Sequence, residues 1–259
     1  MNDNLCEVPM DRRTLLTSVL GMTALSACGG RIRDPNEVII GSSPTGVPFS
    51  FVDPATNALT GSIVEIAQAV TDNLSLQAEM RITPFSALLP SLLARKIDVI
   101  AAAMLRTPER EKVVAFSDPV YAYSAALVVP AADRRMYRDL HAIRDLRVGA
   151  QVGTRFVDQL RDAGVQNVST YDGLFDILRD LDNGRIDAGY GDEPILRYQL
   201  RVGPRRAVRL VSGFQAPARE ELCLILRKDD PLLHRVNSAI EHMKNGRFLD
   251  IARRWKLEG

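Results

Sequence analysis

Hydrophobic positions follow two alternating patterns through most of the chain. Short apolar runs predict buried strands, and apolar residues three or four positions apart, such as Ile63, Ile66 and Val70, predict helices. Strands and helices that alternate in this way indicate βαβ units, so we expect α/β sheets covered by helices. The predicted strands are residues 38–40, 76–82, 98–103, 125–129, 147–150, 168–171 and 186–190, and the predicted helices begin near residue 61 or cover 88–93, 154–162 and 174–181.

One helix–turn–strand pattern occurs twice in the chain. Helix-turn-strand units often look alike, so the likeness alone leaves two interpretations open: coincidence, or two lobes of related design. In the second case the loops 104–110 and 191–193 face one cleft, because ligands bind beyond the carboxyl ends of strands in open α/β sheets. The first copy contains Leu88, Leu89, Leu92, Ile97 and Asp98, and the second contains Ile177, Leu178, Leu181, Ile186 and Asp187, each 89 residues later.

The first 27 residues read as an export signal that is removed from the mature protein. Arg12 and Arg13 precede an uncharged apolar stretch, residues 15–27. That stretch has about half the length needed to span a bilayer, which is typical of a signal peptide rather than a membrane anchor. The arginine pair resembles a twin-arginine signal, and the general secretory route remains an alternative.

The segment that ends at Cys28 resembles a bacterial lipobox. Small residues precede Cys28 in the sequence Leu25-Ser26-Ala27-Cys28, and residues 28–36 look like a flexible tether. We therefore expect Cys28 to carry a lipid anchor; an ordinary buried cysteine is the alternative. Cys6 leaves with the signal, so only Cys223 remains, within an apolar run where it packs as a small core residue. The mature chain is then expected to form no intramolecular disulfide.

Composition narrows the class of protein. The 259 residues carry 33 Lys and Arg against 32 Asp and Glu, with 46% hydrophobic residues, which is typical of a globular protein. A net charge of +1 argues against a nucleic-acid partner, since binding to phosphate backbones requires clustered cations. The three histidines are scattered, so neither a metal site nor a cofactor is expected.

Several short motifs make the chain similar to a known family. Together they resemble the extracytoplasmic solute-binding proteins of ABC importers, in family 3, which binds polar amino acids and has the periplasmic binding protein type 2 fold. The resemblance covers nearly all of residues 37–257. The motifs are Pro48-Phe49, Ile97-Asp98-Val99-Ile100, Thr107-Pro108-Glu109-Arg110, Phe116-Ser117-Asp118-Pro119, Gly153-Thr154, Gly184-Arg185-Ile186-Asp187, Asp192-Glu193 and the ending from Gly246 to Trp255.

The resemblance implies an α/β fold of two lobes, each a mixed sheet flanked by helices, joined by two hinge crossings. Lobe 1 would comprise residues 37–122 plus 216–259, and lobe 2 residues 123–215. A ligand would bind between the lobes and favour a closed form. The protein would be an exported monomer, periplasmic or on the cell surface, that delivers its ligand to an ABC permease in the membrane.

The resemblance also implies the two charged contacts of the ligand. Arg110 matches the arginine that holds the ligand α-carboxylate, and Asp192 matches the acid that binds the α-ammonium group. A guanidinium suits the first role because its planar fork donates two parallel hydrogen bonds. The alternatives are a surface salt bridge of Arg110 with Glu109 or Glu111, and a helix N-cap role for Asp192.

Other positions match the family less closely. Thr154, before a predicted helix, would add a second contact to the carboxylate, although helix capping explains it as well. Phe49 and Phe85 match rings that line the pocket, and as core aromatics they would be equally ordinary. Glu65 stands at a position where the family pattern also has an acid. Ser43 and Gly46 stand where an acid and an aromatic are usual, and Leu105 stands where a small hydroxyl residue is usual.

These departures leave the ligand open. A less polar amino acid, or a zwitterion such as a compatible solute, fits as well as Arg, His or Gln. The leading hypothesis is a binding protein and not an enzyme. The alternatives are an enzyme that resembles cyclohexadienyl dehydratases, which act on prephenate or arogenate, and a ligand-sensing module. The enzyme would use Glu65, Asp192 and Glu193 as acids, with Arg155 near the anion.

Overall fold

The computed structural model describes residue 34 and residues 36–257, which fall almost entirely within one compact unit, Pro35–Gly259. The predicted export signal, Cys28 and most of the tether lie outside the described residues. Within residues 36–257, no helix is both long and apolar enough to span a membrane.

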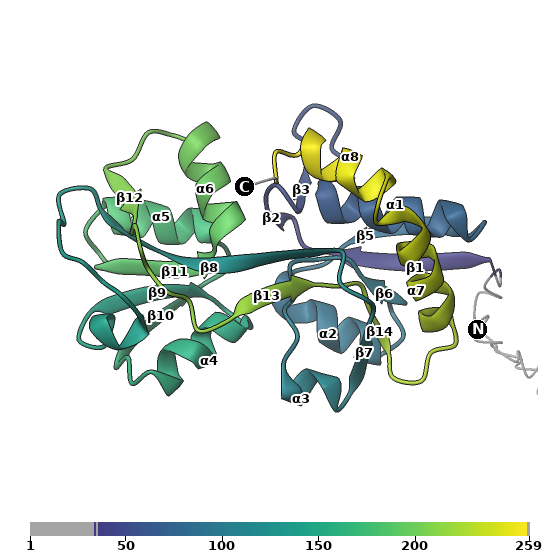
Figure 1. Ribbon diagram of the computed structural model, residues 1–259, viewed down its shortest axis with the longest axis horizontal. Coiled ribbons are helices and arrows are strands. Elements are labelled where there is room, and N and C mark those ends of the chain that lie inside the picture. The colour runs from purple at the N-terminus through teal and green to yellow at the C-terminus, as the bar shows by residue number, and fades with distance from the viewer. Residues whose placement is uncertain (1–33, 35, 258–259) are drawn as a thin grey trace, which may run out of the picture. The chain divides into compact units, whose positions relative to one another are not determined.

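Lobe 1 is built on a five-stranded sheet with the order β5-β1-β6-β14-β7 (Figure 1). The first three strands are parallel, and β14 runs antiparallel to both of its neighbours. A small antiparallel sheet, β2-β3-β4, adjoins it. The strands are β1 (Glu37–Ser42), β2 (Thr45–Gly46), β3 (Ser50–Val52), β4 (Leu59–Thr60), β5 (Gln77–Ile82), β6 (Val99–Ile100), β7 (Val114–Phe116) and β14 (Ile225–Arg227), and the helices are α1 (Ser62–Asn73), α2 (Phe85–Leu93), α3 (Pro108–Glu111), α7 (Leu232–Met243) and α8 (Arg247–Arg254).

Lobe 2 is built on a second mixed sheet, with the order β10-β9-β11-β8-β12. Its first three strands are again parallel, and β8 runs antiparallel to β11 and β12. Its strands are β8 (Tyr121–Pro130), β9 (Arg147–Gln151), β10 (Asn167–Tyr171), β11 (Ala188–Asp192) and β12 (Val208–Leu210), and its helices are η1 (Leu140–Ile143), α4 (Arg155–Asp162), α5 (Leu174–Asp182) and α6 (Glu193–Val202). The predicted α/β class, with mixed sheets flanked by helices, is therefore confirmed.

The sequence repeat occupies equivalent places in the two lobes. Asp98 and Asp187 each accept a hydrogen bond, at 2.9 Å, from a backbone N–H of the neighbouring central strand, at Ile39 and Arg147 respectively. The paired residues Ile97 and Ile186 likewise contact glycines of those strands, Gly41 and Gly149, where a Cβ would collide with them. The two-lobe interpretation of the repeat thus has a structural basis.

Two of the predicted strands differ from those observed. The run 98–103 contains only the two-residue strand β6, and the strand expected at 186–190 is β11, shifted to Ala188–Asp192. Asp98 and Asp187 are each the last residue of the turn rather than the first residue of the strand. The carboxylate of each binds the backbone of the adjacent strand, and the backbone pairing between the two strands begins one residue later.

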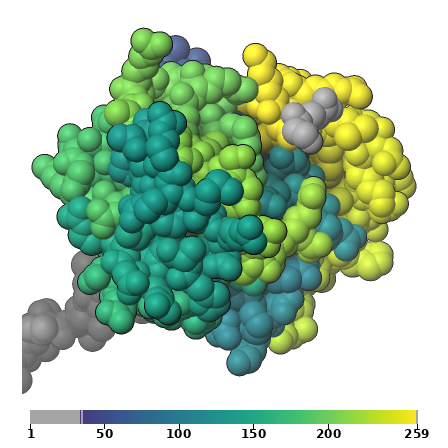
Figure 2. Space-filling view, turned by 60° about the vertical axis from the view of Figure 1, so that its left-hand side comes forward, coloured from purple at the N-terminus to yellow at the C-terminus, as the bar shows by residue number. Residues whose placement is uncertain are grey.

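Two adjacent antiparallel strands connect the lobes. The long strand β8 begins beside β13 (Arg219–Leu222), with Tyr121 opposite Leu222, and continues into the sheet of lobe 2. Figure 1 shows both strands crossing the middle of the unit, and Figure 2 shows lobe 2 beside the C-terminal helices of lobe 1. The lobe boundaries near residues 122 and 216 stay predictions.

The remaining cysteine lies in the core, as expected. Cys223 is fully buried and free, between β13 and β14. Burial raises the pKa of its thiol to about 11, so the thiol stays protonated and inert at neutral pH.

Candidate functional site

Arg110 is placed by a capped helical turn in lobe 1. The hydroxyl of Thr107 accepts a hydrogen bond from Arg110 N at 3.2 Å, and Pro108 occupies the first helical position, where its missing N–H costs nothing. The motif Thr-Pro-Glu-Arg is therefore a helix start that directs one arginine. Burial lowers the pKa of Arg110, and the group remains a cation at every physiological pH.

The guanidinium of Arg110 reaches from lobe 1 to lobe 2. Its Nη1 donates to the carbonyl of Leu105, and its Nη2 donates to the carbonyl of Gly153 at 2.8 Å. No carboxylate among the described residues forms an ion pair with it. Glu111, one of the alternative partners, lies 3.6 Å from Arg106 instead. Backbone carbonyls satisfy the geometry of the fork, and the nearest negative charges, those of Asp158 and Glu109, act on it without an ion pair.

The turn before α4 brings lobe 2 against this arginine. Gly153 has φ +74°, a backbone conformation that favours glycine. A Cβ built there would lie 3.6 Å from Ser86 and 4.0 Å from the ring of Phe85, both at the start of α2. Phe85 is buried beside the turn, and Arg110 binds the carbonyl of the same glycine from lobe 1.

Thr154 follows in the N-cap position of α4, yet its side chain does not cap the helix. Its hydroxyl donates to the carbonyl of Gln151 at 2.7 Å. The backbone N–H groups at the start of α4 therefore keep no side-chain cap, and the capping alternative does not describe Thr154 in this structure. An eight-residue helix that starts beside Arg110 adds donors suited to an anion.

A short polar chain also crosses between the lobes. Ser43 is buried, and its hydroxyl lies 2.9 Å from that of Thr45, which in turn accepts a hydrogen bond from Nε2 of Gln151 at 3.2 Å. Gln151 also donates to the carbonyl of Asp172 at 2.9 Å. Where the family pattern has an acid, this chain thus has a neutral hydroxyl, which reaches Gln151 of the other lobe only through Thr45.

Asp192 is a buried carboxylate with one hydroxyl partner. It ends β11 with a side chain that does not cap α6, and only 3% of the residue is exposed. Tyr123 donates a hydrogen bond to it from strand β8. Burial raises the pKa of Asp192 to about 7, partly offset by the bond from Tyr123. No Lys or Arg of the described residues forms an ion pair with it.

A buried network that sequence analysis missed joins these two charges. Glu220 of β13 is 2% exposed and accepts hydrogen bonds from Arg155 at 2.9 Å and from Gln159 at 3.1 Å. The negative charge of Glu220 contributes to the raised pKa of Asp192, and the positive charge of Arg155 contributes to the lowered pKa of Arg110. The only sequence signal was the alternation of Arg219-Glu220-Glu221-Leu222, which gives no indication that one acid is buried.

The structure does not bring every predicted residue to this group. Glu65 pairs with Arg254 of α8 at 2.8 Å, so its carboxylate serves helix packing. Phe49 is fully buried, with its ring centroid 5.4 Å from that of Tyr123, so it supports the tyrosine that binds Asp192. Leu105 contributes its carbonyl rather than its side chain. Residues 36–257 contain no group of His, Cys, Asp and Glu that could hold a metal ion.

The acidic residues that the alternative enzyme would use are likewise not brought together. Glu65 pairs with Arg254, and Glu193 pairs with Arg197 one helical turn away. Arg155, the extra cation, is occupied by Glu220. Asp192 is the one member of that set without an ion pair to a described residue, and its hydroxyl partner is Tyr123.

Comparison with known proteins identifies the family of the chain. The sequence profile of the bacterial extracellular solute-binding proteins, family 3, matches residues 38–258. The chain belongs to this family. The arginine-binding protein 1 of an Escherichia coli ABC transporter is 30% identical to this solute-binding protein over 225 residues, which cover 85% of this chain and 90% of that protein. The relatives found in this way are binding proteins rather than enzymes.

Solved structures show the same two-lobed fold. An ancestral arginine-binding protein bound to arginine is 30% identical and superposes with a TM-score of 0.77, covering 85% of this chain and 98% of its own. An ancestral amino-acid-binding protein described as a precursor of cyclohexadienyl dehydratase is 25% identical, with a TM-score of 0.76 over 85% of this chain and 95% of its own. The fold predicted from the motifs is confirmed, and the precursor in that enzyme lineage is itself a binding protein.

Proposed function

We propose that this solute-binding protein captures the main-chain zwitterion of an amino acid between its lobes and delivers it to an ABC permease. One observation carries the proposal: two opposite charges at the lobe interface, the half-buried Arg110 and the buried Asp192, form no ion pair with any described residue. Unpaired buried charges are costly, and a ligand that carries both signs compensates both at once. The relative that binds arginine in an ABC transporter supports the same role.

In the proposed complex, the α-carboxylate of the ligand takes the fork of Arg110 from the carbonyl of Gly153. A carboxylate is the stronger acceptor, because the resulting bidentate pair joins a full negative charge to the guanidinium. The uncapped N–H groups at the start of α4, beside Thr154, add donors to the same carboxylate. The α-ammonium group binds Asp192 and stabilises its ionised form.

The side chain of the ligand lies toward Ser43 and Gln151, whose side chains offer a neutral hydroxyl and a neutral amide. We expect a neutral side chain that hydrogen-bonds weakly or packs against Phe85. Structures related to this chain include one with arginine bound, so arginine belongs in any screen as the direct competitor of this expectation. Binding of a compatible solute with both charges fits the same pair of contacts.

The location of the protein follows from its N-terminus. Residues 1–27 act as the export signal. Lipid on Cys28 holds the mature chain at a membrane, and residues 28–36 form a tether that lets the lobes extend away from that membrane. The protein then acts as an anchored monomer, periplasmic or on the cell surface. Its family name supports export, and the anchor rests on the lipobox resemblance.

A thermal-shift screen tests the proposed function. The purified mature protein is heated with each L-amino acid and with zwitterionic solutes, and at least one is expected to raise the melting temperature in proportion to its concentration. Arg110→Ala should abolish the shift. Arg134→Ala, at an exposed arginine outside the cleft, should keep it. A screen without any stabilising zwitterion contradicts the proposal.

A further inference from the structure

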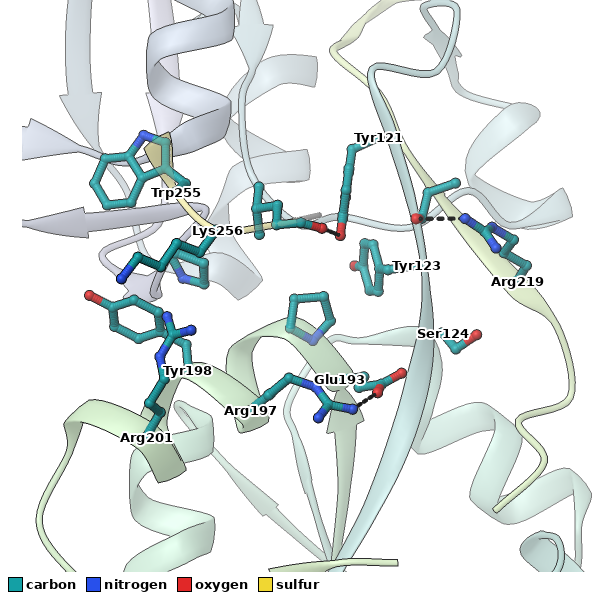
Figure 3. Close-up of a pocket in the computed structure, with 14 residues that line it drawn as sticks. Tyr121, Tyr123, Ser124, Glu193, Arg197, Tyr198, Arg201, Arg219, Trp255 and Lys256 are labelled. Atoms are coloured by element: carbon teal, nitrogen blue, oxygen red, sulfur yellow. Dashed lines mark hydrogen bonds and ion pairs between the residues drawn. The ribbon is translucent and has the colours of Figure 1, made fainter. Parts of the chain in front are cut away.

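A cavity lies between the lobes, beside the group formed by Arg110 and Asp192. It measures about 780 Å³ and is lined mainly by three parts of the chain, with Pro48 and Arg219 as further lining residues (Figure 3). Its floor is the first part of β8, Tyr121 to Ser124, one wall is helix α6 of lobe 2, and the opposite wall is the C-terminal segment Trp255 to Leu257 of lobe 1. We call this cavity the hinge pocket.

The hinge pocket carries a surplus of positive charge. Four of its lining residues are cationic, and Glu193 is its one carboxylate. Glu193 is already paired with Arg197. The other three cations are Arg201, Arg219 and Lys256, and none of them forms an ion pair with any described residue. Arg219 donates to the carbonyl of Ala122 at 3.3 Å, and Arg201 lies over the ring of Tyr198 at 5.3 Å.

Two of these unpaired cations come from different lobes. Arg201 belongs to α6, and Lys256 follows α8; both line the pocket, and Figure 3 draws them on either side of Tyr198. Like charges that face one pocket repel each other, and the cost falls when an anion sits between them. The walls also supply aromatic faces, since Trp255 and Tyr198 line the same space.

The hydroxyl group on the floor of the hinge pocket already forms a hydrogen bond within the protein. The hydroxyl of Tyr121 donates to the carbonyl of Leu257 at 2.7 Å, which fixes the C-terminal segment against β8. Lys256 is therefore held at the rim by the residue that follows it. The lining offers cationic donors beside apolar rings, a combination that suits a small organic anion.

We propose that the hinge pocket binds a compact dianion, such as a dicarboxylate or a phosphate group, through Arg201 and Lys256. The dianion bridges the two lobes outside the amino-acid cleft. This site does not depend on the proposed amino-acid ligand, because none of its residues belongs to the group around Arg110 and Asp192 except Tyr123, which lines both.

Isothermal titration of the full purified protein tests the site. Inorganic phosphate and succinate are titrated separately at pH 7.5 and low salt, with acetate as the monoanion. We expect saturable binding of one dianion per chain, and at least tenfold weaker binding of acetate. Binding of phosphate, of succinate or of both supports the proposal, and a comparison of the two titrations identifies the preferred type of dianion.

Matched variants decide whether these two residues form the site. The double change Arg201→Gln and Lys256→Gln is expected to weaken dianion binding at least tenfold. The control, Arg134→Gln and Arg144→Gln, removes the same charge from exposed positions of lobe 2 and should leave it unchanged. Arg110→Ala should also leave it unchanged, which separates this site from the cleft. Absence of saturable binding at millimolar dianion, or equal losses in both double variants, overturns the proposal.

Discussion

Arg110 and Asp192 are both charged groups whose hydrogen-bond partners are neutral. Arg110 donates to two backbone carbonyls, and Asp192 accepts from the hydroxyl of Tyr123. Burial shifts both pKa values toward the neutral form, downward for the guanidinium and upward to about 7 for the carboxyl group. The carboxyl group is the one that changes charge near neutral pH, so it controls how the cleft responds to pH.

Amino-acid affinity should rise with pH through the pKa of Asp192. The ligand ammonium group binds the ionised carboxylate, and the pKa of about 7 means that most molecules are protonated at pH 6. The dissociation constant is therefore expected to be about tenfold larger at pH 6 than at pH 8. Titration calorimetry at both values measures it. Asp192→Asn should bind weakly with no such dependence, and an unchanged dependence in that variant would show that another group is responsible.

The unliganded protein should become less stable as pH rises from about 4 to 7 because of the same group. Its folded pKa of about 7 lies above the ordinary value of 3.8, so the folded state holds more protons in this window. The contribution is complete below the unfolded pKa and is lost as pH rises through the folded one. Its slope reaches at most about 1.4 kcal/mol per pH unit. Urea unfolding of the wild type and Asp192→Asn should differ by this slope, and parallel curves contradict it.

At the scale of elements, turns at strand ends position the site. The β9–α4 turn presents the carbonyl of Gly153 to Arg110, and the turn after β6 presents Leu105 and the capped helix α3. The same geometry recurs in both lobes, where Asp98 and Asp187 bind the adjacent strand. These carboxylates hold the N-terminal ends of the strands, and the turns of the site follow the opposite, carboxyl ends.

Replacing the glycine of the β9–α4 turn should reduce both stability and affinity. Gly153 has φ +74°, so Gly153→Ala costs about 1–2 kcal/mol and moves the carbonyl that faces Arg110. Gly164→Ala is the matched control, with φ +79° and nothing within 4 Å of the added Cβ. Chemical denaturation should show similar losses for both variants, whereas calorimetry should show weaker ligand binding for Gly153→Ala alone. Equal affinities would mean that the turn does not shape the site.

Helices and strands could be predicted where the hydrophobic pattern that defines them lies within a short stretch of the sequence. Helical spacing and apolar runs located half of the strands and half of the α-helices of the described residues, and the repeated Ile-Asp pair anticipated two related lobes. Glu220 and Arg155 were missed as a pair because they meet only when α4 packs on the crossing strand β13. Glu65 illustrates the opposite case. It matches an acid of the family pattern, but α8 supplies Arg254 and draws the carboxylate away from the cleft group.

At the scale of the molecule, the cleft and the hinge pocket are both made by two lobes around β8 and β13. Contacts across the cleft include Arg110 with Gly153 and Thr45 with Gln151. These contacts hold the described lobes together without a ligand, and in the proposed complex a zwitterion would replace part of them with stronger charged bonds. Ligand binding would thereby favour the closed arrangement that a permease would recognise.

The lipid anchor proposed for Cys28 belongs to the same scale. Cys28→Ala removes the site of lipidation and leaves the lobes intact, so the protein should move from the membrane fraction to the soluble extracytoplasmic fraction. Fractionation followed by immunoblotting measures the change. Cys6→Ala, within the export signal, is the control and should leave the mature protein on the membrane. Membrane retention of the Cys28 variant would contradict the anchor.

The central claim is that Arg110 recognises the α-carboxylate of an amino acid. Titration calorimetry tests it with the amino acid that stabilises the protein most and with the α-carboxamide of the same compound, in the wild type and in Arg110→Ala. The wild type should prefer the acid by at least about 100-fold, since truncating one member of a buried charge pair costs about 3 kcal/mol or more. Arg110→Ala should bind both compounds weakly and about equally. A preference for the acid that is equally large in both proteins would contradict the account.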